Sequence, residues 1–415
     1  MKTNGVPKIR FKGFTDDWEE RKLGELVTFS KGSGYSKGDL LKEGTPIILY
    51  GRLYTKYETV ISNVDTFVEP KGKSVFSKGG EVIVPGSGET AEDISIASVV
   101  EESGVLLGGD LNIITPPKEI NSAFLAISIS NGKPHKDMAK MAQGKSVVHL
   151  HNSDLAKIDF PFPIYEEQCR ISNQFAELDN LITLHQRKCE QTKELKKFML
   201  QKMFPKKGEK NPEIRFPGFT DDWEERKLSS GLHEYTDRVI VEDDKGYYQI
   251  SVRNNFGGIT LRGSKMGNKI GRKRQAKINL TKYPQTLIFT RQTVEQGGIG
   301  WVEKYCDGAI VTENMPTISL DTSVFSKYFL TNLFQTKIFY KNAILDNIEG
   351  GSAQIAIHES KFLSSTLLFP NLDEQEKIGS FFKQIDETII LHQRKCEQLK
   401  ELKKFMLQNM FPKKG

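Results

Sequence analysis

The sequence predicts an α+β protein with two similar globular domains, each a twisted mixed β-sheet with helices, separated by two long helices that form an antiparallel coiled coil in a pseudo-two-fold circular arrangement. Three observations support this fold: a repeat of about 207 residues, a heptad pattern late in each copy, and strand-like runs divided by turns between the repeated segments. The predicted boundaries are 1–160 for module 1, 164–205 for the first long helix, 206–367 for module 2 and 371–412 for the second long helix.

Two segments recur almost unchanged. Residues 9–23 return at 214–228 with one difference, and residues 184–208 return at 391–415 with two differences. The differing positions are Lys12/Pro217, Thr192/Leu399 and Lys202/Asn409. The intervening segments share only a faint skeleton, so two variable modules alternate with near-constant parts. The end of the second copy would run on naturally into the start of the first, which is the condition for a circular arrangement with adjacent termini.

Each long helix is predicted from apolar residues that alternate at spacings of four and three. The pattern covers about 38 residues, or roughly 57 Å of helix at 1.5 Å per residue. Because the copies are near-identical and the repeat closes on itself, we expect the two helices to pack antiparallel on each other. The core of the predicted seam consists of Ile171, Phe175, Leu178 and Ile182 in the first helix, and Ile378, Phe382, Ile385 and Ile389 in the second.

Each seam also contains a His and a Cys four residues apart, His185 with Cys189 and His392 with Cys396. Four such side chains are a possible zinc set. In an antiparallel pair, however, equivalent positions meet only at the dyad, so the four groups converge poorly. We therefore predict no metal site and treat cysteine here as a small apolar seam residue.

The modules show strand-like runs bounded by glycine-rich turns, followed by a helix. Module 1 has predicted strands at 46–50, 81–84, 94–100, 111–115 and 147–151 and a helix at 122–130; module 2 has strands at 247–252, 286–290, 300–304, 317–320 and 354–358 and a helix at 326–337.

Composition narrows the class of protein. Four cysteines in 415 residues exclude a disulfide scaffold and favour a reducing compartment. No apolar run approaches the roughly 18 residues of a membrane span, and the first residues lack the apolar region of a secretory signal. We therefore expect a cytoplasmic protein without a membrane partner.

The net charge of +6 is mild, but residues 245–294 contain eleven Lys or Arg and neither Asp nor Glu. So many positive charges repel one another unless an anionic partner compensates them, and nucleic acid is the first candidate. A solvated basic face without a partner is the alternative. Arginine reads guanine in the major groove, whereas lysine mainly neutralises phosphate. The candidate DNA contacts are Tyr35, Lys37, Arg52, Tyr54, Lys56 and Lys145 in module 1, and Arg253, Arg262, Lys265, Lys269, Arg272, Lys273, Arg274 and Arg291 in module 2.

Catalytic motifs are missing from the sequence. No Asn/Asp-Pro-Pro-aromatic motif for adenine-N6 chemistry occurs, and Thr115-Pro116-Pro117-Lys118 has the wrong ends. Residues 144–146 read Gly-Lys-Ser, like the end of a P-loop, but Ala139 stands at the position of its first glycine. We therefore predict no catalytic residue and no cofactor bound by this chain.

Taken together, the alternation of two divergent modules with two near-identical helices resembles the specificity subunit of type I restriction–modification systems, over essentially the whole chain. The features that carry the resemblance are Asp-Asp-Trp-Glu at 16–19 and 221–224, Gly-Ser-Ala-Gln at 351–354, and the Pro, Glu-Gln and Ile positions Pro163, Glu167, Gln168, Ile171, Pro370, Glu374, Gln375 and Ile378. Module 1 departs from the closing pattern, with Lys145 and Val147 in place of Ser352 and Gln354.

The resemblance implies that each module is a target recognition domain that binds one half of a bipartite target in double-stranded DNA. It implies that the helix pair sets the spacer and docks two methyltransferase (modification) subunits, joined by restriction/translocase subunits. S-adenosylmethionine, ATP and Mg are then expected on the partner subunits, and the chain itself is not an enzyme. Two alternatives stay open: a self-contained DNA methyltransferase or nuclease fusion, and a structural coiled-coil adaptor that does not touch DNA.

Overall fold

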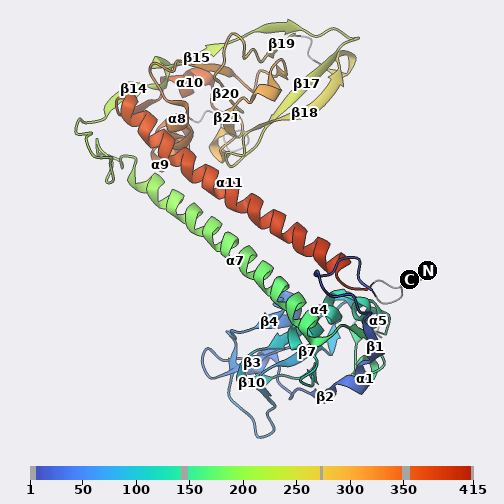
Figure 1. Cartoon of the computed structure of the whole chain (residues 1–415). Coiled ribbons are helices and arrows are strands. Elements are labelled where there is room, and N and C mark those ends of the chain that lie inside the picture. Colours follow the sequence, from blue (N-terminus) through green and yellow to red (C-terminus); the bar gives the residue numbers. More distant parts are fainter. Residues whose placement is uncertain (1–5, 142–147, 272–273, 348–355, 413–415) are drawn as a thin grey trace. The chain divides into compact units, whose positions relative to one another are not determined.

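In the computed structural model, residues 6–141, 148–271, 274–347 and 356–412 are described. The chain forms two compact units, unit 1 (Met1–Gln186 and Arg394–Gly415) and unit 2 (Arg187–Gln393). Each unit therefore contains one module, the first half of one long helix and the second half of the other. Figure 1 shows these two helix halves running antiparallel within each unit, as the sequence predicts.

Unit 1 begins with a two-stranded sheet in which the repeated segment pairs antiparallel with the strand before the first long helix, so that Glu19 lies opposite Phe162. Two larger sheets follow. The five-stranded sheet has the spatial order β2 (Thr28–Lys31), β11 (Leu111–Thr115), β7 (Glu81–Pro85), β9 (Ser98–Val100) and β4 (Val60–Ile61). The four-stranded sheet has the order β5 (Phe67–Val68), β3 (Thr45–Ile48), β10 (Ser103–Leu107) and β6 (Phe76–Lys78). The two-stranded sheets are β1 (Glu19–Lys22) with β13 (Asp159–Phe162), and β8 (Ser87–Gly88) with β12 (Val148–His149).

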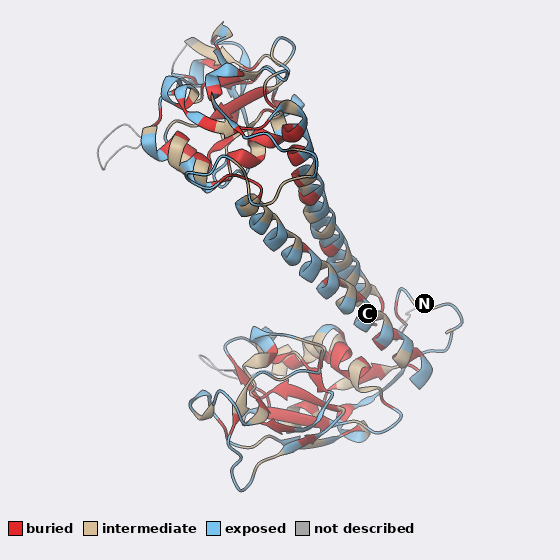
Figure 2. Cartoon of the chain, turned by 90° about the vertical axis from the view of Figure 1, so that its left-hand side faces the viewer, coloured by how far each residue is buried: buried red, intermediate tan, exposed pale blue. Residues whose placement is uncertain are grey.

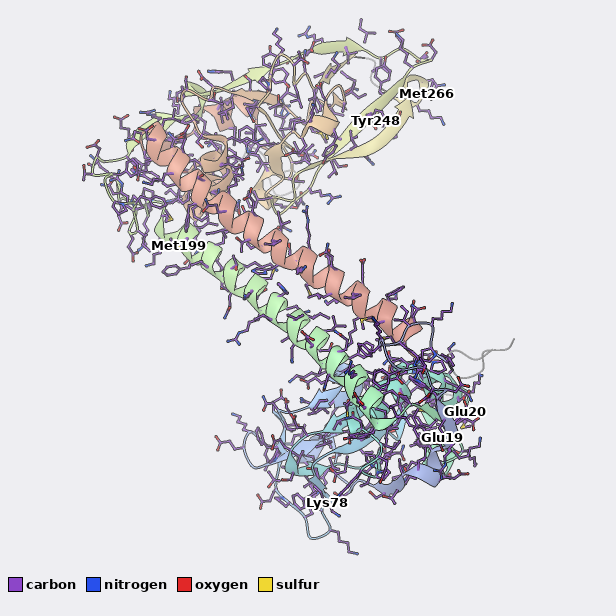
Figure 3. All side chains as sticks on the ribbon, in the orientation of Figure 1. Glu19, Glu20, Lys78, Met199, Tyr248 and Met266 are labelled. Atoms are coloured by element: carbon purple, nitrogen blue, oxygen red, sulfur yellow. The ribbon has the colours of Figure 1, made fainter. Side chains whose placement is uncertain are left out.

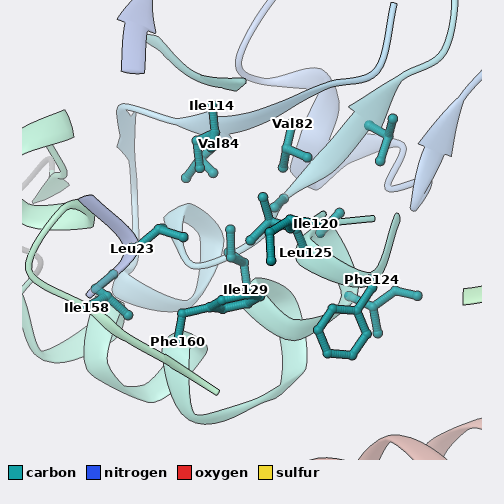
Figure 4. Packing of buried hydrophobic residues seen from close by; sticks show 14 of the residues in the cluster. Leu23, Val82, Val84, Ile114, Ile120, Phe124, Leu125, Ile129, Ile158 and Phe160 are labelled. Carbon is teal, nitrogen blue, oxygen red and sulfur yellow. The ribbon is translucent and has the colours of Figure 1, made fainter. Parts of the chain in front are cut away.

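The helices of unit 1 pack on the larger sheet, except Arg52–Thr55, whose Leu53 packs in a separate core. The N-terminus of α4 is capped by Asn121, whose Oδ1 accepts the N–H of Phe124 at 2.9 Å, and Phe124 and Leu125 then pack into the core between the sheet and the helices (Figure 4). These helices are α1 (Leu23–Leu26), α2 (Arg52–Thr55), α3 (Ala91–Ile94), α4 (Ser122–Asn131), α5 (Lys133–Met141), α6 (Asn152–Leu155) and α7 (Tyr165–Lys202).

Unit 2 repeats the two-stranded start, here β14 (Glu224–Lys227) with β24 (Thr366–Phe369). Its four-stranded sheet has the spatial order β15 (Leu232–Tyr235), β23 (Thr317–Leu320), β20 (Thr286–Phe289) and β21 (Ile299–Trp301). Its five-stranded sheet has the order β16 (Arg238–Ile240), β19 (Arg274–Lys277), β22 (Ile310–Val311), β17 (Gly246–Val252) and β18 (Ile259–Met266). Its helices include α8 (Lys327–Leu333), α9 (Lys337–Phe339), the π-helical turn η6 (Tyr340–Ile344), α10 (Glu359–Ser364) and α11 (Leu372–Asn409).

The helix seam is buried as predicted, and Figure 2 shows buried stretches in red on the long helices. Ile171, Phe175, Leu178 and Ile182 are all buried in α7. In α11, Ile378, Phe382 and Ile385 are buried, and Ile389 packs partly buried against the core of unit 2. Cys189 and Cys396 are also buried. An apolar stripe of this length accounts for the antiparallel pairing within each unit.

In each unit, a lysine in the seam is neutralised by an aspartate on the opposing helix. Lys403 lies 2.5 Å from Asp179 in unit 1, and Lys196 lies 2.7 Å from Asp386 in unit 2. The start of each repeat is likewise bonded to the end of a long helix. The N–H of Ile9 donates to the carbonyl of Asn409 at 3.0 Å, and the N–H of Ile214 donates to that of Lys202 at 2.9 Å.

Four predicted strands are corrected. The run 94–100 contains a helix end and a strand, because Thr90 caps α3 by accepting the N–H of Asp93 at 3.1 Å. The run 300–304 ends early, since Lys304 begins a 3-10 helix. Of the run 147–151, Val147 lies outside the described residues; the strand covers Val148–His149, and the N–H of His151 instead bonds Asp154 in α6, at 3.1 Å. Of the run 354–358, residues 354–355 lie outside the described residues, and 356–358 are not part of a strand, because His358 caps α10.

Candidate nucleic-acid interface

The repeated motifs hold each module on the helices through a buried ion pair. In unit 1, Arg10 donates from Nε and Nη2 to the two carboxylate oxygens of Glu167, at 2.8 and 2.6 Å, and from Nη1 to the carbonyl of Asp16 at 2.7 Å. Glu167 is 1% exposed. Two parallel bonds to one carboxylate fix both distance and orientation, so the segment before module 1 is locked onto the first turn of α7.

Unit 2 repeats this ion pair. Arg215 donates to the two carboxylate oxygens of Glu374 at 2.7 and 2.8 Å, and to the carbonyl of Asp221 at 2.7 Å. Glu374 is fully buried. We call this attachment of a module to a long helix the joint. Its geometry is the same in two divergent modules, which indicates that the near-constant segments specify the joint rather than the module.

The neighbouring motif residues complete the joint. The side chain of Gln168 accepts the N–H of Asn121 at 2.9 Å and donates to the carbonyl of Pro163 at 2.9 Å. The ring of Trp18 lies 5.6 Å from Phe124 and 6.2 Å from Phe411, at the end of α11. In unit 2, Trp223 lies at similar centroid distances from its counterparts, 5.8 Å from Phe329 in the module and 6.1 Å from Phe204 at the end of α7.

The five-stranded sheet of unit 2 has at one edge a two-stranded ribbon, β17 with β18. In β18 every residue from Arg262 to Met266 is exposed. Tyr248 on β17 is 57% exposed and lies opposite Ser264 (Figure 3). Arg262 is the extra residue of a bulge, because Leu261 and Gly263 pair with the consecutive residues Ile250 and Gln249. Gly263 has φ +117°, a backbone conformation that favours glycine.

The ribbon combines exposed basic side chains with a width that a DNA groove can accommodate. Lys265 lies opposite Tyr247, whose hydroxyl accepts the N–H of Glu242 at 3.0 Å and so holds the β17 strand. A two-stranded ribbon fits the major groove, which is about 12 Å wide. The exposed Tyr248 was not among the predicted contacts, although the Gly-Tyr-Tyr start of β17 is the signal that would have found it.

The predicted contacts of module 2 divide into three groups. Arg253, Arg262, Lys265 and Lys269 are exposed on β18 or the turns beside the ribbon. Arg291 is bonded through Nε to the buried Glu359 at 2.8 Å, and it lines a groove of about 770 Å³ beside β15 and β16. Arg272 and Lys273 lie outside the described residues, and Arg274 begins β19.

In module 1, two predicted contacts are held inside the module. Tyr35 is 8% exposed, its hydroxyl bonds Ser74 Oγ, and it accepts the N–H of Lys71 at 2.6 Å. The guanidinium of Arg52 donates to Asp65 at 2.6 Å and to Glu58 at 2.8 Å. These two side chains are therefore not free on the surface as the sequence suggested, because their polar groups already have partners within the module.

The remaining contacts of module 1 are more accessible. Lys37 and Tyr54 are exposed, and Lys56 is exposed but lies 3.0 Å from Asp65. Lys145 lies outside the described residues. All of these DNA contacts stay predictions. Among the described residues, no group of three or more His, Cys, Asp or Glu side chains is placed to hold a metal ion, and no helix is long and apolar enough to cross a membrane.

The family described as "Type I restriction modification DNA specificity domain" matches the chain twice, over residues 15–194 and 220–401. The chain belongs to this family. Both matches include the Trp of the repeated motif, the buried Glu that binds the arginine, and most of a long helix.

Two curated relatives from Methanocaldococcus jannaschii match nearly the full length. The chain is 23% identical over 410 residues to the "Type I restriction enzyme MjaVIII specificity subunit", covering 94% of this chain and 91% of the relative. It is 24% identical over 435 residues to the "Putative type I restriction enzyme MjaX specificity subunit", covering 97% and 95%.

Solved structures share the fold. The type I restriction–modification system S subunit from M. genitalium matches with a TM-score of 0.59 at 12% identity, covering 99% of this chain and 100% of that one. A chain from the structure "Structural basis underlying complex assembly and conformational transition of the type I R-M system" matches with a TM-score of 0.50 at 15% identity, covering 95% and 97%. The α+β fold with two repeated domains and long helices is therefore confirmed.

Proposed function

We propose that this chain is the non-catalytic DNA-recognition subunit of a type I restriction–modification complex, in which each module binds one half of a bipartite target in double-stranded DNA. The observation that carries the proposal is that two specificity domains are mounted on the same buried Arg–Glu joint but differ in the sheet beyond it. Two modules that are attached in the same way but have different surfaces beyond the joint are suited to recognising two different DNA sequences.

The long helices then set the distance between the half-sites and dock two modification subunits, with restriction subunits joining the assembly. S-adenosylmethionine, ATP and Mg belong to those partners. A helix advances 1.5 Å per residue, whereas duplex DNA advances about 3.4 Å per base pair along each strand, so a seam of fixed length specifies a spacer of fixed length. The proposal places the assembly in the cytoplasm, where the DNA is.

The test is an exchange of one module. Residues 28–143 are replaced by the corresponding segment of another family member, and the chain is expressed with its modification subunits. Methylome sequencing of the host should show one half-site changed and the other half-site and the spacer retained. The reciprocal exchange of residues 233–350 is the matched control and should change only the other half-site. If either exchange alters both halves together, the modular reading is wrong.

A further inference from the structure

Unit 1 contains a groove of about 660 Å³ between α5 and the last turns of α11. Among the described residues, six lysines line it, three from each helix, against one acidic residue, Asp137. The lysines are Lys133, Lys136 and Lys140 on α5, and Lys400, Lys403 and Lys404 on α11. So many like charges around one hollow repel one another unless an anion lies between them.

Two of the six lysines hold the walls of the groove. Lys133 lies 2.8 Å from Glu20 and 3.4 Å from Asp159, so it ties α5 to the sheet formed by β1 and β13. Lys403 bonds Asp179 across the helix seam at 2.5 Å. Both side chains are largely buried, at 14% and 22% exposed. Their charges are already compensated, and their role is to set the width of the groove.

Three other lysines are free to bind a ligand. Lys136, Lys400 and Lys404 are exposed, and no ion pair is found for them among the described residues. The sixth, Lys140, lies 3.8 Å from Asp137, a long contact for an ion pair. The groove therefore presents at least three ammonium groups from two facing helices.

Unit 2 also brings lysines together near the end of α7. The ammonium of Lys207, beyond the end of α7, is near enough to Lys341 on η6 to lower the pKa of Lys341. Lys193 and Lys197 are the sequence counterparts of Lys400 and Lys404. In unit 2 a module lysine, Lys341, thus lies beside a lysine that follows the end of a long helix.

The chemistry of the groove indicates what kind of anion it takes. The α11 wall belongs to the segment that recurs almost unchanged at 184–208, so it cannot read two different base sequences. Backbone phosphates are the same at every base pair, and lysine is suited to neutralise them.

The groove also adjoins a predicted DNA contact region. Tyr57, which follows Tyr54 and Lys56, donates its hydroxyl proton to Ser130 Oγ at 3.2 Å, and the next residue, Asn131, lines the groove. A duplex held by the loop after α2 would therefore have this groove beside it.

We propose that the lysine groove between α5 and the end of α11 binds backbone phosphates of double-stranded DNA, as a contact independent of base sequence that supplements the base-reading surface of module 1. The inference rests on the proposed function. It adds a DNA-binding site that includes the near-constant helix and therefore lies outside the divergent parts of the modules.

The test uses the full chain and a duplex of arbitrary sequence, because a phosphate site does not require the target. The groove variant is K136Q/K400Q/K404Q, which leaves the wall pairs of Lys133 and Lys403 intact. The matched control is K118Q/K188Q/K395Q, which removes the same charge from exposed lysines outside the groove. Duplex binding is measured by fluorescence anisotropy between 50 and 200 mM salt, and circular dichroism checks that each variant is folded.

The expected result concerns the slope of log affinity against log salt concentration. Each lost phosphate contact reduces its magnitude by about 0.9, so the groove variant should lose up to roughly 2.7 while the control matches the wild type. Equal slopes in all three proteins would overturn the groove proposal and leave the proposed function standing. A groove variant that keeps its slope but no longer co-purifies with modification subunits would assign the groove to a protein partner. A wild-type chain without any salt-dependent duplex binding would overturn both proposals.

Discussion

Module 1 and module 2 are similar in the half next to the long helices and differ in the half beyond it. Next to the long helices, both have four antiparallel strands in corresponding order, β2-β11-β7-β9 and β15-β23-β20-β21. Beyond that sheet they diverge. Module 1 adds a four-stranded sheet in which β10 and β3 are parallel, whereas module 2 adds five strands that include the long β17–β18 ribbon.

The difference follows from what each half must contact. The shared half is held on α7 and α11 by buried groups, such as Trp18 in the repeated segment and Glu167 on α7 itself, where almost any substitution leaves a cavity or an uncompensated charge. The distal half packs mainly on itself, so that whole sheets can be exchanged if each closes its own small core. Four predictions test this comparison.

The largest expected effect is on a fragment of residues 1–208. This fragment lacks α11 and also Phe411, which follows α11 and whose ring lies 6.0 Å from Phe124 and 6.3 Å from Phe175. Its own residues 184–208 nearly repeat residues 391–415, so a second copy can supply Phe204 in place of Phe411 and Lys196 in place of Lys403 opposite Asp179. We expect an antiparallel dimer, measured as molar mass by light scattering, that directs methylation to an inverted repeat of the module 1 half-site.

A single substitution sharpens the fragment prediction. Leu399 packs against the core of unit 1, but the fragment offers Thr192 at that position. T192L should therefore strengthen the dimer by about 1 kcal/mol at each of two sites, or roughly thirtyfold in Kd. A folded fragment that stays monomeric at high micromolar concentration, with or without T192L, would show that the halves do not pair in this way.

The next effect concerns the two joints. R10A and R215A each leave a buried glutamate without its cation, which costs about 3–5 kcal/mol. If the joints are equivalent, the two variants should lower the free energy of unfolding of their own unit by similar amounts, as followed by denaturant unfolding. The controls are E167Q and E374Q, which keep the shape of the acid and should cost less. A large loss in one unit and none in the other would contradict the shared mount.

A smaller effect separates predicted DNA contacts that look alike in sequence. R262Q/K265Q changes exposed side chains of the ribbon, so stability should change by no more than about 0.5 kcal/mol while the salt slope of duplex binding falls by roughly 1.8. R52Q should do the reverse, because the side chain of Arg52 is 9% exposed and bound to two carboxylates; it should cost about 1.5–3 kcal/mol. Anisotropy and thermal unfolding of both variants check this contrast, and equal behaviour would refute it.

The sequence predicted best what is repeated or periodic. The seams of α7 and α11 were predictable because Ile171, Phe175 and Leu178 recur in register at Ile378, Phe382 and Ile385. The ribbon strand β18 was missed because five of its eight residues are exposed and show no apolar alternation. Partners distant in the sequence were missed as well, since nothing local to Tyr35 or Arg52 reveals Lys71, Ser74 or Asp65 across a loop.

The smallest expected effect is a difference in acid sensitivity between the two distal halves. In module 1, Asp39 is bonded by Lys71 at 2.6 Å and by the N–H of Ser36 at 2.8 Å, and these bonds lower the pKa of Asp39 from 3.8 to about 2. A carboxylate whose pKa is lowered by folding stabilises the folded state above its unfolded pKa, and that contribution is lost as the pH falls from about 3.8 to about 2. The effect is small because the pair is exposed. Module 2 has no acidic residue between 245 and 294, so its ribbon has no such group to protonate. Hydrogen exchange between pH 5 and pH 2, corrected for the intrinsic rate, should therefore show β3 and β5 losing protection before β17 and β18. K71Q removes the main cause of the shift and should move the titration of Asp39, followed by NMR, back towards 3.8. Equal loss of protection in the two sheets would mean that packing, rather than charge, sets the stability of both distal halves.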